Sequence, residues 1–276
     1  MLRRLQHGDG QLVYRVTGTG ETVLLLHGSA GSHLLWRRLS RALEAGYLVI
    51  APDLWGYGQS SAWHDILHFG LAEEMAPLWH LLPRDGPLHI VGYSYGAVVA
   101  LGLALAKKRT LSSLALIEPV AFRLLEDGGH AHLFDQVASW RRRFEAHAQR
   151  GDIDAAMRSF VHYWSAGAVA WESFAEEARD QLLTAVPRIL LDQRVAFETS
   201  FSGEALTSLA VPTLLVCGGR SPSPTRELAL ELARRIRGSE LAVIEAAGHD
   251  LPTSHGEELK DKLLPHLAAS SMTIPR

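Results

Sequence analysis

The chain has 276 residues, of which 47% are hydrophobic, and its formal net charge is −3 from 27 basic and 30 acidic residues. This content can bury the core of one main domain, and the mixed charges form no basic stripe of the kind that neutralises nucleic-acid phosphates. No apolar run reaches the roughly 18 residues of a membrane span. We therefore expect a cytoplasmic protein that binds neither nucleic acid nor membrane. The oligomeric state is left open.

Short apolar runs alternate with helical patterns along most of the chain. Two runs separated by a tight turn, at residues 2–5 and 11–16, predict a hairpin at one edge of a sheet. Buried strands are predicted at residues 23–26, 47–51, 88–91, 113–117, 213–217 and 241–244. Helices are predicted at residues 34–43, 72–82, 95–106, 225–236 and 257–267. The alternation indicates an α/β fold with a doubly wound, mostly parallel sheet of eight strands.

The interval 120–209 departs from this rhythm. It carries Trp and Phe residues at helical spacing, mixed with Arg and Glu, and contains no obvious strand. We expect an inserted helical cap, or lid, between two parts of a core domain, residues 1–119 and 210–276. The aromatic residues favour a small apolar substrate, although the same residues also suit the core of the cap itself.

The strongest motif is Gly92-Tyr93-Ser94-Tyr95-Gly96, which follows a predicted strand and precedes a predicted helix. A G-x-S-x-G pentapeptide in this context is typical of a nucleophile elbow, which lifts the serine hydroxyl above the sheet. The helix that follows points its N-terminus at the serine and favours developing negative charge. The alternative is a glycine-rich turn whose serine only caps a helix.

The loops after two earlier predicted strands contain residues with expected roles in or near the site. An elbow of this kind works with an oxyanion hole whose amides come from an earlier loop and from the residue after the nucleophile, so we predict the backbone N–H groups of Ser29 and Tyr95. His27, just before this position, is expected to organise its loop by satisfying nearby backbone groups. Asp53, after the next strand, is expected to hold a glycine-containing loop by accepting backbone hydrogen bonds.

These motifs, together with Gly248-His249 near the end of the chain, resemble the α/β-hydrolase superfamily. The resemblance covers nearly the whole chain and is least specific in the cap interval. It implies that His249, which follows the last strand, is the general base of a catalytic triad with Ser94. It also implies chemistry without a metal or an organic cofactor.

The acid of the triad is where the chain departs from the usual pattern of the superfamily. Most members carry an acidic residue after the penultimate strand, but here that loop is Gly218-Gly219-Arg220-Ser221. Some members, such as one group of haloalkane dehalogenases, place the acid at the end of the strand after the nucleophile helix. Glu118 occupies that position here and is our predicted acid. Asp250 is the rival, and a solvent-facing or arginine-paired Glu118 is the structural alternative.

A serine nucleophile predicts acyl transfer through an acyl-enzyme, with a carboxylic ester, lactone or thioester as substrate. Two other functions stay open. One is a carbon-carbon bond hydrolase of vinylogous diketones, because a His-Gly-Ser opening with a helical cap resembles that group as well. The other is a small-molecule-binding protein that kept the fold without turnover, because fold alone does not determine function.

Overall fold

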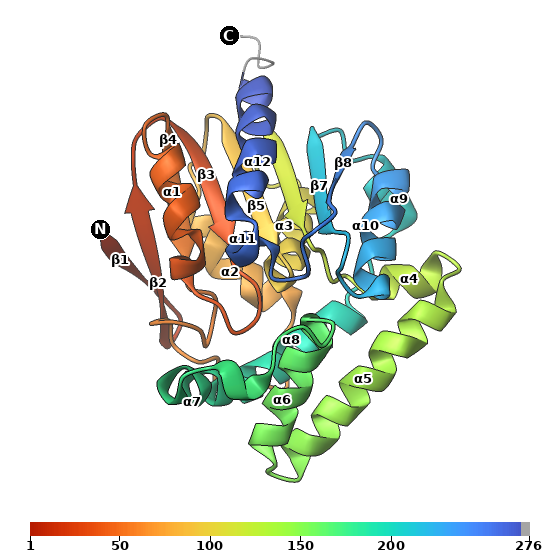
Figure 1. Cartoon of the computed structure of the whole chain (residues 1–276). Coiled ribbons are helices and arrows are strands. Elements are labelled where there is room, and N and C mark those ends of the chain that lie inside the picture. The colour runs from red at the N-terminus through yellow and green to blue at the C-terminus, as the bar shows by residue number, and fades with distance from the viewer. Residues whose placement is uncertain (272–276) are drawn as a thin grey trace.

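The computed structural model describes residues 1–271, and its centre is one eight-stranded sheet in the order β1-β2-β4-β3-β5-β6-β7-β8. The sheet runs parallel from β4 to β8, while β1 and β2 are antiparallel and form one edge. The predicted α/β fold is therefore confirmed (Figure 1). The strands are β1 Leu2–His7, β2 Gly10–Thr17, β3 Glu21–Leu26, β4 Tyr47–Pro52, β5 Leu88–Tyr93, β6 Ser113–Ile117, β7 Thr213–Gly218 and β8 Glu240–Ile244.

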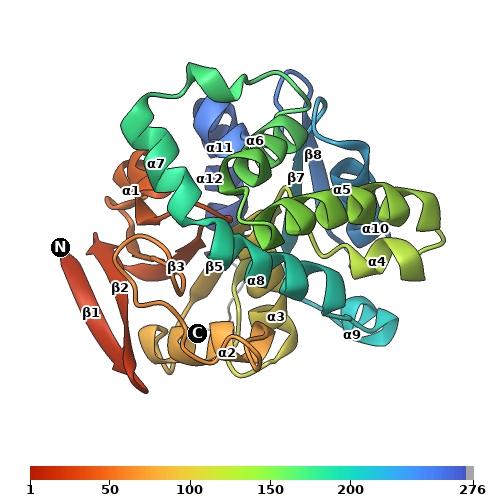
Figure 2. The same cartoon turned by 90° about the horizontal axis from the view of Figure 1, so that it is seen from below.

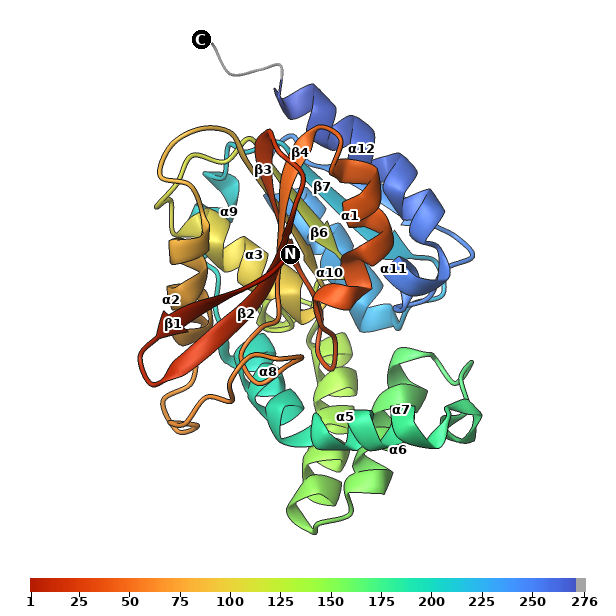
Figure 3. The ribbon, with the colours of Figure 1, turned by 90° about the vertical axis from the view of Figure 1, so that its left-hand side faces the viewer.

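Helices cover both faces of the sheet, which is why most side chains of the central strands are apolar on both faces. Along β3, Val23 and Leu25 face one helical layer and Leu24 and Leu26 face the other, as the two-residue repeat of a strand requires. The first layer contains η1 His33–Trp36, α1 Arg37–Leu43, α11 Leu251–Ser254 and α12 Gly256–Ser271, and the second contains α2 Leu71–Leu81, α3 Tyr95–Leu105 and α10 Ser223–Arg235. Figure 3 shows α1 and α12 on one side of the sheet and α2 and α3 on the other.

The helix α3 is buried along almost its whole length, from Tyr95 to Ala104. Its sequence is apolar all round, as expected for a helix without a solvent face. It is also the helix that follows the motif around Ser94, so its N-terminus is held rigidly by the core. Cys217 lies in β7 and is buried, and burial raises the pKa of its thiol to about 12.

Between β6 and β7 the described chain contains helices and no strand. These are α4 Arg123–Asp127, α5 Ala131–Gln149, α6 Ile153–Trp164, η2 Trp171–Ser173, α7 Glu176–Thr184, α8 Val186–Glu198 and α9 Gly203–Thr207. Helices α5 to α8 lie across one end of the sheet, as Figures 1 and 2 show, and α9 packs beside α10. The division into core and cap remains our prediction, and residues 272–276 of the predicted core lie outside the described residues. Among residues 1–271, no helix combines the length and apolar character needed to cross a bilayer.

Candidate active site

Ser94 occupies a sharp turn between β5 and α3. Its backbone has φ 53° and ψ −118°, a strained conformation for a residue with a side chain. The N–H of Ser94 donates to the carbonyl of Ile117 on the neighbouring strand at 2.9 Å, which helps to hold the turn. Glycine is required on both sides, because a Cβ on Gly92 would lie 2.3 Å from the Gly96 carbonyl oxygen and one on Gly96 would lie 2.4 Å from that of Leu26.

Three predicted side chains from distant parts of the sequence meet at this end of the sheet. The Oγ of Ser94 lies 3.0 Å from Nε2 of His249, and Nδ1 of His249 lies 2.8 Å from Oε2 of Glu118. All three side chains are buried, with exposed fractions of 7%, 5% and 0%. A hydroxyl, an imidazole and a carboxylate in this sequence of contacts can pass a proton from serine to histidine.

Glu118 is held at the end of β6 by several contacts that the sequence did not reveal. Its backbone has φ 50°, and its N–H donates to the carbonyl of Val216 at 2.8 Å. Its Oε1 accepts hydrogen bonds from the N–H of Gly218 and, at 2.8 Å, from the hydroxyl of Ser221. Donors to one oxygen orient the carboxylate so that the other faces His249. These contacts favour Glu118 over Asp250 as the partner of the histidine.

His249 is also fixed from its other sides. The ring of Trp164, at the end of α6, stacks on the imidazole with centroids 4.2 Å apart and planes 29° apart. The hydroxyl of Tyr93 donates to the backbone carbonyl of His249 at 2.8 Å. Neither contact was predicted. For Trp164 the reason is that spacing along α6 does not tell which aromatic residue of the helix faces the sheet.

The predicted oxyanion amides lie beside Ser94. Ser29 and Tyr95 line the same small cavity as the Ser94 side chain. Within residues 1–271 the structure gives neither backbone N–H a hydrogen-bond partner. Both groups are therefore free to donate to a substrate oxygen, and their role as the oxyanion hole remains a prediction.

The loops before and after this site are organised as the sequence predicted. His27 is fully buried; its Nδ1 lies 2.7 Å from the Gly28 carbonyl oxygen, and its Nε2 accepts from the N–H of Leu54 at 3.0 Å. Asp53 accepts from the N–H of His33 at 2.7 Å and from that of Gln59 at 2.9 Å. The His27 ring is a neutral link between two loops, and Asp53 anchors its own loop.

Neutral His27 makes the stability of the protein depend on pH. Burial lowers the pKa of His27 from 6.5 to about 4. Between these two pH values, His27 is therefore neutral in the folded state and protonated in the unfolded state. The stabilising contribution is complete above pH 6.5 and is lost as the pH falls toward 4, by on the order of 3 kcal/mol. Urea titrations measure the free energy of unfolding of the wild type and of a His27→Gln variant. The wild-type value should fall relative to that of the variant as the pH is lowered from 7.5 to 4.5. A difference between the two proteins that does not change with pH would contradict the prediction.

A cavity of about 290 Å³ opens beside Ser94 and His249. Five of the twelve residues that line it are apolar residues of the segment between β6 and β7, and Ser29, Ser94 and His249 also line it. The apolar residues are Phe160, Val161, Trp164, Val169 and Phe174. Within the described part of the chain, no group of three His, Cys, Asp or Glu side chains is arranged to hold a metal ion.

A family model for the alpha/beta hydrolase fold matches residues 21–255. The chain belongs to the α/β-hydrolase fold family. A pimeloyl-acyl-carrier protein methyl ester esterase of Neisseria meningitidis serogroup B is 27% identical over 241 residues, which are 85% of this chain and 88% of the esterase. A 2-hydroxy-6-oxononadienedioate/2-hydroxy-6-oxononatrienedioate hydrolase of Paraburkholderia xenovorans is 25% identical over 281 residues, covering 96% of this chain and 94% of that hydrolase.

Among solved structures, a bromoperoxidase from Bacillus anthracis superposes with a TM-score of 0.78 at 23% identity, covering 97% of this chain and 100% of that chain. At this identity the likeness shows the α/β-hydrolase fold alone. The family and the curated relatives together support a hydrolase.

Proposed function

We propose that this α/β-hydrolase is a serine hydrolase that cleaves an ester-type bond, in a carboxylic ester, lactone or thioester, through an acyl-enzyme. The observation that carries the proposal is the 3.0 Å contact of the Ser94 hydroxyl with His249, whose other ring nitrogen faces the buried Glu118 at 2.8 Å. The base contacts both the nucleophile and the orienting carboxylate, as serine acyl transfer requires.

The reaction follows from this arrangement in two halves. Ser94 Oγ attacks the substrate carbonyl while His249 accepts its proton, and the resulting oxyanion accepts hydrogen bonds from the N–H groups of Ser29 and Tyr95. Collapse breaks the bond to the leaving group, which takes the proton from His249. Water then attacks the acyl-enzyme with His249 as base, and the acid product and free Ser94 are released. Glu118 stabilises the imidazolium in both halves.

The cavity beside the site supports a substrate with an apolar portion. Its wall includes Phe160, Trp164 and Phe174, and apolar walls with a few polar groups are usual for small-molecule sites. Trp164 covers His249, so the substrate group nearest the base meets an aromatic surface.

A carbon-carbon bond hydrolase is the second candidate function. It is favoured by the match to the Paraburkholderia xenovorans hydrolase, which spans 96% of this chain. In that case the same site would act on a vinylogous diketone, and the bond broken would be carbon to carbon instead of carbon to oxygen or sulfur.

Labelling with a fluorophosphonate probe followed by peptide mapping tests the proposal. A serine hydrolase should be modified at Ser94, because the probe reacts with an activated serine hydroxyl. No labelling at Ser94, together with no turnover of any ester, would reject the proposed enzyme and favour a protein that only binds a small molecule.

A substrate panel separates the two enzymes. We expect turnover of p-nitrophenyl esters, with a preference that changes as the acyl chain lengthens from acetate to decanoate, and little turnover of a vinylogous 1,5-diketone. Faster turnover of the diketone than of every ester would establish the carbon-carbon hydrolase instead.

A further inference from the structure

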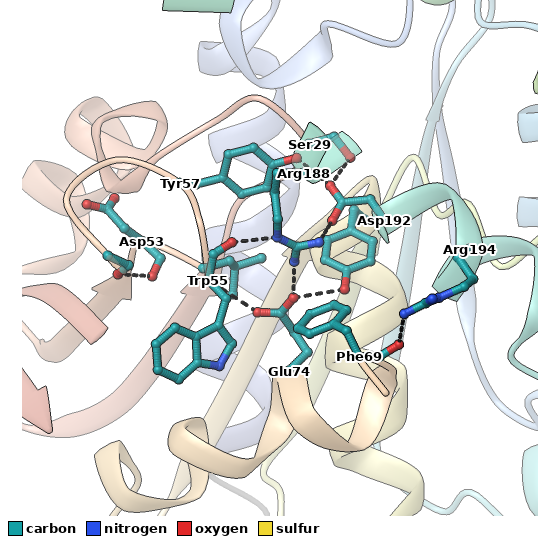
Figure 4. Close-up of polar contacts among 12 residues, drawn as sticks. Ser29, Asp53, Trp55, Tyr57, Phe69, Glu74, Arg188, Asp192 and Arg194 are labelled. Atoms are coloured by element: carbon teal, nitrogen blue, oxygen red, sulfur yellow. Dashed lines mark hydrogen bonds and ion pairs between the residues drawn. The ribbon is translucent and has the colours of Figure 1, made fainter. Parts of the chain in front are cut away.

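A cluster of buried charges lies between the helix α8 and the core of the protein (Figure 4). Arg188 and Asp192 come from α8, and Glu74 comes from α2 on the second helical layer. Their exposed fractions are 6%, 2% and 1%. The guanidinium of Arg188 forms ion pairs with both carboxylates, and its Nε donates to the backbone carbonyl of Trp55 at 2.5 Å. One cation therefore neutralises part of the charge of two buried acids.

Each carboxylate also accepts a hydrogen bond from a residue beside the nucleophile. The hydroxyl of Ser29 donates to Asp192 at 2.5 Å, and the hydroxyl of Tyr95 donates to Glu74 at 2.9 Å. Ser29 and Tyr95 are the two residues whose backbone N–H groups serve as the oxyanion hole in our proposed function. Their side chains are thus bound to the two acids that Arg188 holds together.

Several neighbours make this arrangement rigid. The hydroxyl of Tyr57 donates to the same Asp192 oxygen at 2.6 Å, and the N–H of Trp55 donates to Glu74 at 3.3 Å. The guanidinium carbon of Arg188 lies 4.6 Å from the centre of the Phe69 ring, which covers it with an aromatic face. Buried carboxylates without a cation would repel each other and lose their orientation.

The position of oxyanion donors matters on a scale of a few tenths of an ångström, because the donors stabilise charge that exists only in the transition state. A tether on the side chain of each donor residue limits its backbone movement. Both tethers end on the Arg188 cluster, and Arg188 is in the segment between β6 and β7.

We propose that Arg188 is a positioning residue that aligns the two oxyanion amides through Asp192 and Glu74, so that docking of α8 completes the catalytic site. This inference rests on the proposed function as a serine hydrolase. It makes α8 a part of the machinery for turnover, in addition to any role in covering the substrate.

The first variant is Arg188→Lys, measured with a p-nitrophenyl ester that the wild type hydrolyses. Lysine keeps the positive charge but carries its three N–H donors on one nitrogen, so it cannot reproduce the fixed planar fork with which the guanidinium contacts Glu74 and Asp192 together. Loss of one whole oxyanion donor costs about 10² to 10³ in kcat. We expect misalignment to lower kcat by about 10- to 100-fold, with KM changed by less than about threefold, and to weaken a boronic acid transition-state analogue by a similar factor.

Arg194 provides the matched control on the same helix. Its guanidinium binds the backbone carbonyls of Ile66, at 2.6 Å, and Phe69, so it also ties α8 to the core, but it contacts neither acid of the cluster (Figure 4). Arg194→Met should keep kcat within about twofold of wild type. An equal loss of kcat in both variants would overturn the inference, because the loss would then report general docking of α8.

A second pair of substitutions guards against a variant that does not fold. Ser29→Ala and Tyr95→Phe together remove both tethers, while every buried charge and both backbone N–H groups stay. We expect this double variant to fold and to lose at least about tenfold in kcat. Wild-type kcat in the folded double variant would reject the inference while leaving the serine hydrolase intact. Absence of both ester turnover and Ser94 labelling in the wild type would reject the proposed function, and the inference would fail with it.

Discussion

Ser94→Ala is expected to lower ester turnover by about 10⁴- to 10⁶-fold, because losing the nucleophile of a triad leaves only binding and the oxyanion hole. Alanine fits the strained turn as well as serine does, since the Ser94 side chain makes its hydrogen bond only with His249 among the described residues. The free energy of unfolding should therefore change little. Steady-state kinetics and a urea titration on the same preparation measure the two quantities.

Ser208→Ala is a suitable control for the Ser94 prediction. Ser208 is exposed at the end of α9, where its hydroxyl bonds the carbonyl of Ala205, and it takes no part in the site. Its variant should keep wild-type kcat and remain reactive toward the fluorophosphonate. Turnover close to wild type in Ser94→Ala would show that another group performs the attack.

Glu118→Gln is expected to lower kcat by about 10³-fold or more. The side chain is completely buried and serves two sides, with Oε1 accepting from Gly218 and Ser221 and Oε2 facing Nδ1 of His249. The side chain of glutamine has one oxygen acceptor and one NH2 donor. Its NH2 group therefore faces either Nδ1 of His249 or the N–H of Gly218. In the first case the wrong tautomer of His249 is stabilised, and in the second a buried donor loses its partner.

The rival acid gives the contrasting measurement. Asp250 is exposed and occupies the N-cap position of the short helix after His249 without a capping hydrogen bond from its side chain, so Asp250→Asn should retain kcat within about threefold. Circular dichroism of both variants checks that the buried amide at position 118 is tolerated. If Asp250→Asn lost the activity and Glu118→Gln kept it, Asp250 would be the acid and our assignment would be wrong.

Much of the fold was predictable because its signals are local. Apolar runs such as residues 113–117, of strand length and placed between helical patterns, are typical of strands buried on both faces, and all eight predicted strands are present with ends shifted by at most two residues. The predicted helix at residues 34–43 was less accurate: it begins with the 3-10 turn η1, capped by the Ser32 hydroxyl, before α1 continues. A tighter first turn depends on capping geometry, which an apolar repeat does not report.

The glycines around Ser94 and the order of serine and histidine along the chain were also enough to select two candidate residues. Each follows directly from a strand end, and parallel strands place their carboxyl ends at one edge of the sheet. The same argument nominated Glu118, but it could not show which of the acids faces the imidazole. That depends on β6 lying between β5 and β7, which brings the Gly218–Ser221 loop against the carboxylate.

The sequence by itself thus determined the α/β-hydrolase fold, the strained turn that carries Ser94 and the loops organised by His27 and Asp53, because all of these are encoded in neighbouring residues. Only the tertiary structure decided that Trp164 stacks on His249 and that Arg188 joins Glu74 to Asp192 beneath Ser29 and Tyr95. Apart from the Arg188–Asp192 pair within α8 and the Tyr95–Glu74 bond, those contacts join residues more than 80 positions apart. Their energies depend on which side chains the packed core excludes from water, and no local pattern contains that information.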